Sequence, residues 1–246
     1  MFFSRKKHTE KLDLSWLGAD MHSHLLPGID DGAPDLESSL SFIRGLVDLG
    51  YKKLITTPHI LWELYPNTPE KISTTMETLR KAVNEAGIEV ELHAAAEYYM
   101  DEHFMELLRS KSPLLTIHDN MVLVEFSMIT LPMDLHDILF EMQIQNYQPV
   151  LAHPERYAFL SRRRDYFDGL KDSGCLFQLN LLALTGYYGD TVKDLSEYFL
   201  KKNFYDFAGT DLHNERHLAQ LQKLPSASLK KLQDSGLIRN HHLLSS

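Results

Sequence analysis

The chain has 246 residues, which fits one large domain or two small ones. It carries 25 basic and 34 acidic residues, a net charge of −9 with histidine neutral, and this charge disfavours nucleic acid as the main partner. The hydrophobic content of 43% and the charged content of 24% are those of a globular protein and exclude wholesale disorder.

Cysteine usage and apolar patterning indicate where the protein works. The single cysteine, Cys175, excludes an intramolecular disulfide framework and indicates a reducing compartment. No apolar run reaches the roughly 18 residues needed to span a bilayer, and residues 1–13 lack the apolar core of an export signal. We therefore expect a cytoplasmic protein with no membrane insertion.

Strand and helix patterns alternate along most of the chain. Residues 1–18 are predicted as a polar arm with a short apolar tail, and residues 19–246 as a single domain. The expected strands are 19–23, 53–57, 88–95, 121–126, 148–152, 175–180 and 204–209. The expected helices are 36–49, 68–86, 134–146, 162–173, 190–202 and 226–235.

Two of these helices carry start and stop signals. Gly50 follows the helix expected over 36–49, while Thr68 and Pro69 stand at the N-cap and first position of the next. Seven strands that alternate with helices imply a parallel sheet. At this length we expect an α/β fold built as a closed or nearly closed (βα) barrel, with a doubly wound open sheet as the alternative.

Metal-binding residue types stand at the carboxyl ends of these strands. They are His22 and His24, His59, Glu97, Glu125, His153, and Asp211 with His213; the strand 175–180 offers only Gln178 and Asn180. In a parallel barrel these ends lie on one face, where the loops build the active site. Residues i and i+2 of a strand point the same way, so His22 and His24 can face one centre.

This residue set favours a centre with several metal ions. Carboxylates are almost never buried unpaired, and metal would compensate Glu97 and Glu125 at the ends of apolar strands. Together with Asp31 there are nine candidate ligands, too many for one ion. Histidine and carboxylate without cysteine suit Mn²⁺, Fe²⁺ or Zn²⁺. Three divalent ions and four carboxylates sum to about +2, which suits a phosphate dianion and its hydrolysis.

Two arginines follow histidine motifs, Arg156 in HPER and Arg216 in HNER. An arginine can fork onto phosphate oxygens, although an ordinary surface salt bridge is the alternative for both. For the remaining histidines we expect structural or surface roles. They are His8, His93, His103, His118, His136, His217, His241 and His242.

The motifs HSHLLPGIDDG, TPH, AHPER and GTDLHN resemble those of the polymerase-and-histidinol-phosphatase (PHP) superfamily. Within it, HSHLLPGIDDGA together with AAEYY, HPER and LTGYYG is similar to the CpsB/CapC family of metal-dependent bacterial protein-tyrosine phosphatases. The resemblance runs from about Asp20 to about Asn214. It implies that 19–246 is a PHP phosphatase domain, a distorted (βα)₇ TIM-like barrel with a trinuclear, usually manganese, site.

The resemblance also implies a division of the ligands among the ions. The expected sets are His22, His24 and Asp211 for one ion, Glu125 and His153 for a second with Glu97 bridging, and Asp31, His59 and His213 for a third. Asp30 is the alternative to Asp31. Arg156 would bind phosphate, while Arg216 lies closer to His213 than the family pattern expects, so its role stays open.

The expected reaction is hydrolysis of phosphotyrosine by water activated at the metals. Metals and Arg156 would stabilise the phosphoryl oxygens, and Arg216 is a second candidate for this role. A phenolate, with a pKa of about 10, leaves more easily than a serine alkoxide, and Asp211, His213 or a metal could assist it. The partner that the resemblance implies is the phosphotyrosine-containing tail of a bacterial tyrosine kinase that controls capsular or exopolysaccharide synthesis and export.

Other function classes are weighed against this one. A histidinol-phosphate or other small-molecule phosphatase is the main alternative; a nuclease is disfavoured by the charge, and a non-catalytic scaffold by the complete ligand set. A cysteine-phosphatase mechanism is excluded, since it needs arginine six residues after the cysteine, where this chain has Leu181. The sequence does not decide between a monomer and an oligomer.

Overall fold

The computed structural model describes residues 12–244, and all pairings between its named strands are parallel. The strands are β1 (Ala19–Asp20), β2 (Lys53–Thr56), β3 (His59–Ile60), β4 (Glu91–Ala94), β5 (Glu97–Tyr99), β6 (Met121–Glu125), β7 (Gln148–Ala152), β8 (Leu176–Asn180) and β9 (Phe207–Gly209). They form a three-stranded sheet of order β1-β2-β4 and a six-stranded sheet of order β3-β5-β6-β7-β8-β9.

The two sheets are arcs of one ring of strands. β3 follows β2, and β5 follows β4, after two residues each, and Glu97 N–H donates to Pro58 O (3.1 Å) where the second sheet begins. Across the remaining gap, a parallel bridge joins Ser23 to Leu212 just beyond β1 and β9. The predicted (βα)₇ barrel is confirmed in this distorted form, and the open doubly wound alternative is wrong.

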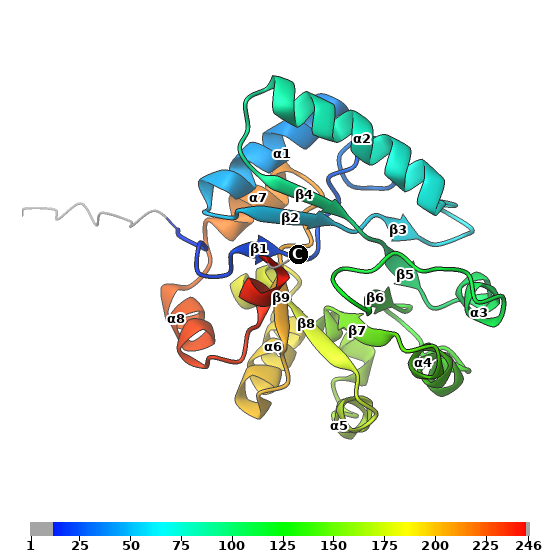
Figure 1. The fold of residues 1–246 in the computed structure, drawn as a ribbon. Coiled ribbons are helices and arrows are strands. Elements are labelled where there is room, and N and C mark those ends of the chain that lie inside the picture. The colour runs from blue at the N-terminus through cyan, green and yellow to red at the C-terminus, as the bar shows by residue number, and fades with distance from the viewer. Residues whose placement is uncertain (1–11, 245–246) are drawn as a thin grey trace, which may run out of the picture.

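Helices surround the strands, with α1 and α2 over β2 and β4 and α3 to α6 around the rest (Figure 1). The helices are α1 (Leu36–Asp48), α2 (Pro69–Glu85), α3 (Glu102–Arg109), α4 (Leu135–Ile144), α5 (Asp165–Asp172), α6 (Asp190–Lys202), α7 (Glu215–Leu221) and α8 (Ser226–Asp234). Short 3₁₀ turns occupy Pro154–Arg156, Ala158–Leu160, Leu181–Thr185 and Asn240–Leu244. No helix within residues 12–244 is long and apolar enough to cross a bilayer.

Two helices, α3 and α7, and two short strands, β3 and β5, were not predicted. α3 and α7 have eight and seven residues, too few for a clear apolar period, and each begins at a side-chain cap, Asp101 and Asn214. The strand expected over 88–95 is β4, and the chain then continues into β5; the strand expected over 19–23 ends at Asp20. His22, two residues after β1, and Glu97, the first residue of β5, both belong to the group of ligands described below.

Apolar side chains form two cores. Ala19, Ile55, Leu123 and Val150 lie in the cluster that fills the barrel, and a larger cluster joins the strands to the helices. Since Leu123 faces the barrel interior, Glu125 two residues later points the same way, toward its carboxyl end. The core thus forms the apolar floor on which the site rests.

The expected polar arm falls largely outside the described residues, which start at residue 12. Of its apolar tail, Leu14 and Leu17 are buried in the larger core. Leu14 N–H donates to Leu49 O (2.7 Å), so this segment packs beside the end of α1. The boundary between arm and domain at residue 18 stays a prediction.

Gly209, the last residue of β9, packs closely against His22, which follows β1, and against Gln178 of β8. A Cβ there would lie 2.7 Å from His22 Cβ and 2.9 Å from Gln178 Nε2. We expect Gly209→Ala to lower the free energy of unfolding by about 1–3 kcal/mol. Urea unfolding of the chelator-treated protein measures this. Gly169→Ala on α5, where nothing lies within 4 Å, is the matched control and should be neutral or stabilising. Equal losses in both variants would contradict the close packing at Gly209.

Candidate active site

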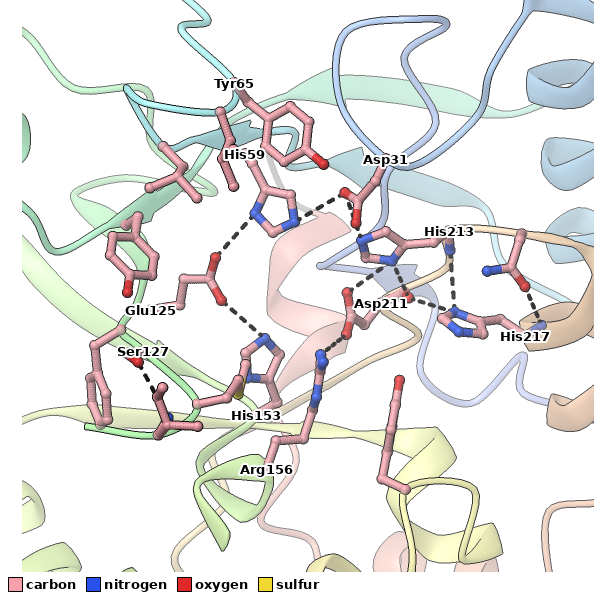
Figure 2. A pocket seen from close by; sticks show the side chains of 18 residues that line it. Asp31, His59, Tyr65, Glu125, Ser127, His153, Arg156, Asp211, His213 and His217 are labelled. Carbon is pink, nitrogen blue, oxygen red and sulfur yellow. Dashed lines mark hydrogen bonds and ion pairs between the residues drawn. The ribbon is translucent and has the colours of Figure 1, made fainter. Parts of the chain in front are cut away.

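A cavity of about 650 Å³ opens at the carboxyl ends of the strands (Figure 2). Histidines and carboxylates from different strand ends face one another across it, with His59, Glu125 and His153 on one side and Asp211 and His213 on the other. Each strand crosses the molecule in the same direction, so residues far apart in sequence meet here.

The most buried group joins His22, His24, Glu97 and Asp211. From His22 Nε2 it is 3.2 Å to Glu97 Oε2, 3.2 Å to Asp211 Oδ1 and 3.3 Å to His24 Nε2. Two ligands bonded to one tetrahedral ion at about 2.1 Å lie about 3.4 Å apart. The spacing of these four side chains is therefore that of a coordination shell.

A second group lies nearer the surface and joins Asp31, His59 and His213 with His24. Asp31 Oδ1 is 3.5 Å from His59 Nε2 and 3.6 Å from His213 Nε2, and its side chain is 56% exposed. Asp30, by contrast, is not part of this group, and its fully buried side chain lies with Oδ2 2.8 Å from His24 Nδ1. The sequence left open which of the two aspartates joins the ligands, and the structure has Asp31 among them.

Glu97 and Glu125 connect the remaining ligands. His59 Nδ1 lies 3.2 Å from Glu97 and 3.1 Å from Glu125, while His153 Nε2 lies 3.1 Å from Glu97 and 3.8 Å from Glu125. His59 therefore presents one ring nitrogen to each of two groups, which the expected division had not foreseen. All nine expected ligands meet at this site, and their binding of metal stays a prediction.

Polar residues behind the ligands fix how the imidazoles point. Gln178 Oε1 lies 2.9 Å from His22 Nδ1 and accepts from His153 N–H at 3.2 Å. Asp30 Oδ2 lies 2.8 Å from His24 Nδ1 and accepts from His59 N–H at 3.2 Å. In the neutral ring, Nδ1–H donates to these acceptors and Nε2 of His22 and of His24 presents its lone pair to the cluster, the form that would bind a metal ion.

The two arginines occupy different places. Arg156 lines the cavity, donates from Nη1 to Asp211 Oδ2 (2.8 Å) and lies over the ring of Tyr188. Arg216, in the first turn of α7, is exposed and lines a neighbouring hollow that shares Asp31 and His213 with the first. Arg156 therefore faces the cluster directly, and Arg216 only its outer side.

Sequence reasoning did not assign His217 or Tyr188 to the site, although both line the cavity. His217 Nδ1 lies 3.2 Å from Asp211 O, and the side chain reaches the cavity from the first turn of α7, which Asn214 caps; the structural or surface role expected of it stays a prediction. Cys175 is buried before β8, at the opposite end of that strand, and burial raises its pKa to about 12. Its thiol is no nucleophile for this cavity.

Residues 18–237 match the family model described as capsular polysaccharide synthesis, CpsB/CapC. The chain belongs to the CpsB/CapC family. It is 29% identical over 196 residues to the tyrosine-protein phosphatase YwqE of Bacillus subtilis (strain 168), a match that covers 79% of this chain and 77% of YwqE. Identity to the tyrosine-protein phosphatase CpsB of Streptococcus pneumoniae is 27% over 201 residues, covering 79% and 82% of the two chains.

Solved structures agree with this membership. A chain from the crystal structures of YwqE from Bacillus subtilis and CpsB from Streptococcus pneumoniae, described as unique metal-dependent tyrosine phosphatases, superposes with a TM-score of 0.78. It is 25% identical, and the match covers 92% of this chain and 91% of that one. An amidohydrolase from Mycoplasma synoviae, 13% identical with 94% and 86% covered, has a TM-score of 0.55 and shares the fold alone.

The donor set of this CpsB/CapC protein fits metal ions. Within residues 12–244, Asp211 Oδ1, His59 Nδ1 and His153 Nδ1 are buried without a hydrogen bond. Burial opposes a charge on His22, yet Glu97 and Asp211 beside it raise its pKa to about 9. Burial likewise opposes the ionised form of Glu97, but His22 and His59 hold the pKa of that carboxyl well below its usual range. Protons thus balance the carboxylates here, and metal ions would displace them.

Asp30 should control metal affinity without being a ligand. Asp30→Ala removes the acceptor at His24 Nδ1, and loss of such a partner weakens metal binding about 10- to 100-fold. Titration of Mn²⁺ into chelator-stripped protein measures it. Asp35→Ala, on the same loop at the N-cap of α1, is the control and should leave the affinity unchanged. Equal affinity in wild type and Asp30→Ala would refute the orienting role.

Proposed function

We propose that this chain is a metal-dependent phosphatase that hydrolyses phosphotyrosine in proteins. The observation that carries the proposal is one cavity in which three overlapping groups of histidine and carboxylate ligands meet the guanidinium of Arg156. Its relatives YwqE and CpsB are named tyrosine-protein phosphatases, which supports the same activity here.

The nine ligands would hold two or three divalent ions. Histidine and carboxylate suit Mn²⁺ first, with Fe²⁺ and Zn²⁺ as the alternatives. When bound, the ions supply a Lewis acid and activate water near neutral pH. Glu97, with one oxygen toward His22 and the other toward His153, is the carboxylate best placed to bridge two ions.

Arg156 would bind the phosphoryl group. Its Nη1 is taken by Asp211, and within residues 12–244 the guanidinium makes no other hydrogen bond, so its remaining N–H groups are available to phosphate oxygens. Planar, delocalised guanidinium matches two phosphate oxygens at once, and that contact strengthens as charge builds on them. Arg156 thus stabilises the transition state; Asp211 and His213 are the candidates near the leaving group.

The cavity mouth favours an aryl phosphate over a small alkyl one. The loops after β3 and β6 form part of its walls and carry apolar side chains, namely Leu61, Leu64, Tyr65, Phe126, Met128 and Ile129. Leu64 and Ile129 at the rim are 68% and 83% exposed. A phosphotyrosine whose phosphate reaches Arg156 passes its ring between such walls, which gain apolar contact from it.

The partner we propose is the phosphotyrosine-containing tail of a bacterial tyrosine kinase that controls capsular polysaccharide synthesis, met in the cytoplasm. The family description and the open cavity mouth support this, because an exposed site admits a phosphorylated segment of another protein. The net charge of −9 argues against nucleic acid as a competing partner.

The proposal is tested with a phosphotyrosine peptide and histidinol phosphate as rival substrates. Chelator should abolish peptide hydrolysis, and Mn²⁺ should restore it, while elemental analysis follows bound metal and parallel additions rank Fe²⁺ and Zn²⁺. Cys175→Ser should keep most activity, since the thiol lies away from the cavity. Full activity in excess chelator refutes the metal site, and preference for histidinol phosphate refutes the substrate class.

Substitution of Arg156 should lower the rate of hydrolysis more than substitution of Arg216. Loss of a transition-state donor costs about 2.7–4 kcal/mol, so Arg156→Ala should lower the rate about 10²- to 10³-fold. Arg156→Lys should not restore it, because a point charge lacks the planar fork. Arg216→Ala, at the exposed neighbouring hollow, should cost less than Arg156→Ala. Rates on the peptide and on a small aryl phosphate, with metal content as control, decide this; a larger loss for Arg216→Ala contradicts the assignment.

A further inference from the structure

Tyr188 belongs to the LTGYYG motif, to which the reaction described above gives no role. It stands between the 3₁₀ turn Leu181–Thr185 and α6, in a loop whose two glycines, Gly186 and Gly189, adopt positive φ angles of 77° and 91°. These left-handed residues turn the chain back sharply enough to bring the tyrosine to the cavity wall. The motif therefore places the side chain of Tyr188 at the cavity wall.

The ring of Tyr188 supports the guanidinium of Arg156. Arg156 Cζ lies 4.7 Å from the ring centroid, within the range of a cation–π contact. Asp211 Oδ2 holds the same guanidinium by one edge at 2.8 Å. One contact restricts the plane of the group and the other its rotation in that plane, which leaves the opposite edge for a ligand.

The hydroxyl of Tyr188 closes a ring of four residues. It accepts from Asn180 Nδ2 (3.1 Å), and the same amide donates to Asp211 Oδ2 (2.8 Å), the oxygen that binds Arg156. Asn180 is the last residue of β8, so the network is anchored on the barrel rather than on a loop. Each member is thereby fixed by its two neighbours.

We propose that Tyr188 is the positioning residue for Arg156 and holds its guanidinium ready for the phosphoryl group. The inference rests on the proposed function for what Arg156 binds, but not for how Arg156 is held. A free arginine side chain loses much rotamer entropy when it grips a phosphate. Tyr188 removes part of that loss before the substrate arrives, so its effect must pass through Arg156.

Three variants test this on the Mn²⁺-loaded full chain. Tyr188→Leu, which removes the ring, should lower kcat/KM for a phosphotyrosine peptide about 5- to 30-fold. Tyr188→Phe keeps the ring and should lose less than Tyr188→Leu. Tyr198→Leu is the matched control and should leave kcat/KM unchanged, because Arg164 Cζ lies at the same 4.7 Å from the Tyr198 ring and Tyr198 does not line the cavity. Thermal unfolding and metal content should match wild type in all three.

A double-mutant cycle separates positioning from packing. If Tyr188 acts through Arg156, Tyr188→Leu should cost nothing further in the Arg156→Ala background. ¹⁵N relaxation of the Arg156 Nε–H group in metal-free protein gives a readout without activity, and Tyr188→Leu should make that group more mobile. Additive losses, or an unchanged Nε–H signal, overturn the inference.

Affinity for inorganic phosphate distinguishes this inference from the proposed function. Suppose that wild type hydrolyses no phosphotyrosine, but that the Tyr188→Leu variant binds inorganic phosphate more weakly than wild type does. The positioning role of Tyr188 then stands, and the proposed function is refuted. If wild type hydrolyses phosphotyrosine and Tyr188→Leu changes neither phosphate affinity nor kcat/KM, the function stands and the positioning role falls.

Discussion

Glu97 carries a carboxylate that is 1% exposed at the centre of the site, and such a group is costly to bury unless cations or donors surround it. The imidazoles of His22, His59 and His153 approach it to 3.2, 3.2 and 3.1 Å. These histidines follow β1, begin β3 and follow β7, so no local segment can supply them. A ring of parallel strands is what brings all three to one point, and satisfying Glu97 therefore depends on the complete barrel.

The ligands also demand backbone conformations that the strands do not favour. His153 and Asp211 are non-glycine residues with φ of 35° and 50°, in or near the left-handed region, which costs about 1–2 kcal/mol each. His153 directly follows β7, and Asp211 follows β9 by two residues. The turn at each position ends the alternation of side chains between the two faces of the strand. Gln178 and Asn180 on β8 then hold the turned residues, through His153 N–H and Asp211 Oδ2.

Most of the ligands could be predicted because they lie at or just beyond the carboxyl end of an expected apolar strand, and parallel strands gather these ends on one face. The supporting residues could not. Gln178 meets His22 across 156 residues, and α5 and β8 lie between Arg156 and Tyr188 in the sequence, so neither contact leaves a local pattern. α7 was not predicted because its seven residues are too few for a clear apolar period. The position of His217 at the cavity therefore could not be predicted either. Arg216 is the opposite case. Its place in the HNER motif suggested phosphate binding, but in the structure its side chain lines a neighbouring hollow.

Asp211 joins the cation-binding and anion-binding parts of the site through its two oxygens. Oδ1 lies 3.2 Å from His22 Nε2 and 3.4 Å from His24 Nε2, while Oδ2 accepts from Arg156 and Asn180. A cation at Oδ1 would neutralise the carboxylate and weaken its hold on the guanidinium. The positive charge of Arg156 would then be left for phosphate, while Tyr188, which Asn180 binds through its hydroxyl, would keep the guanidinium in place. Occupancy of the metal site and readiness for the phosphoryl group would thereby be coupled through a single side chain, that of Asp211.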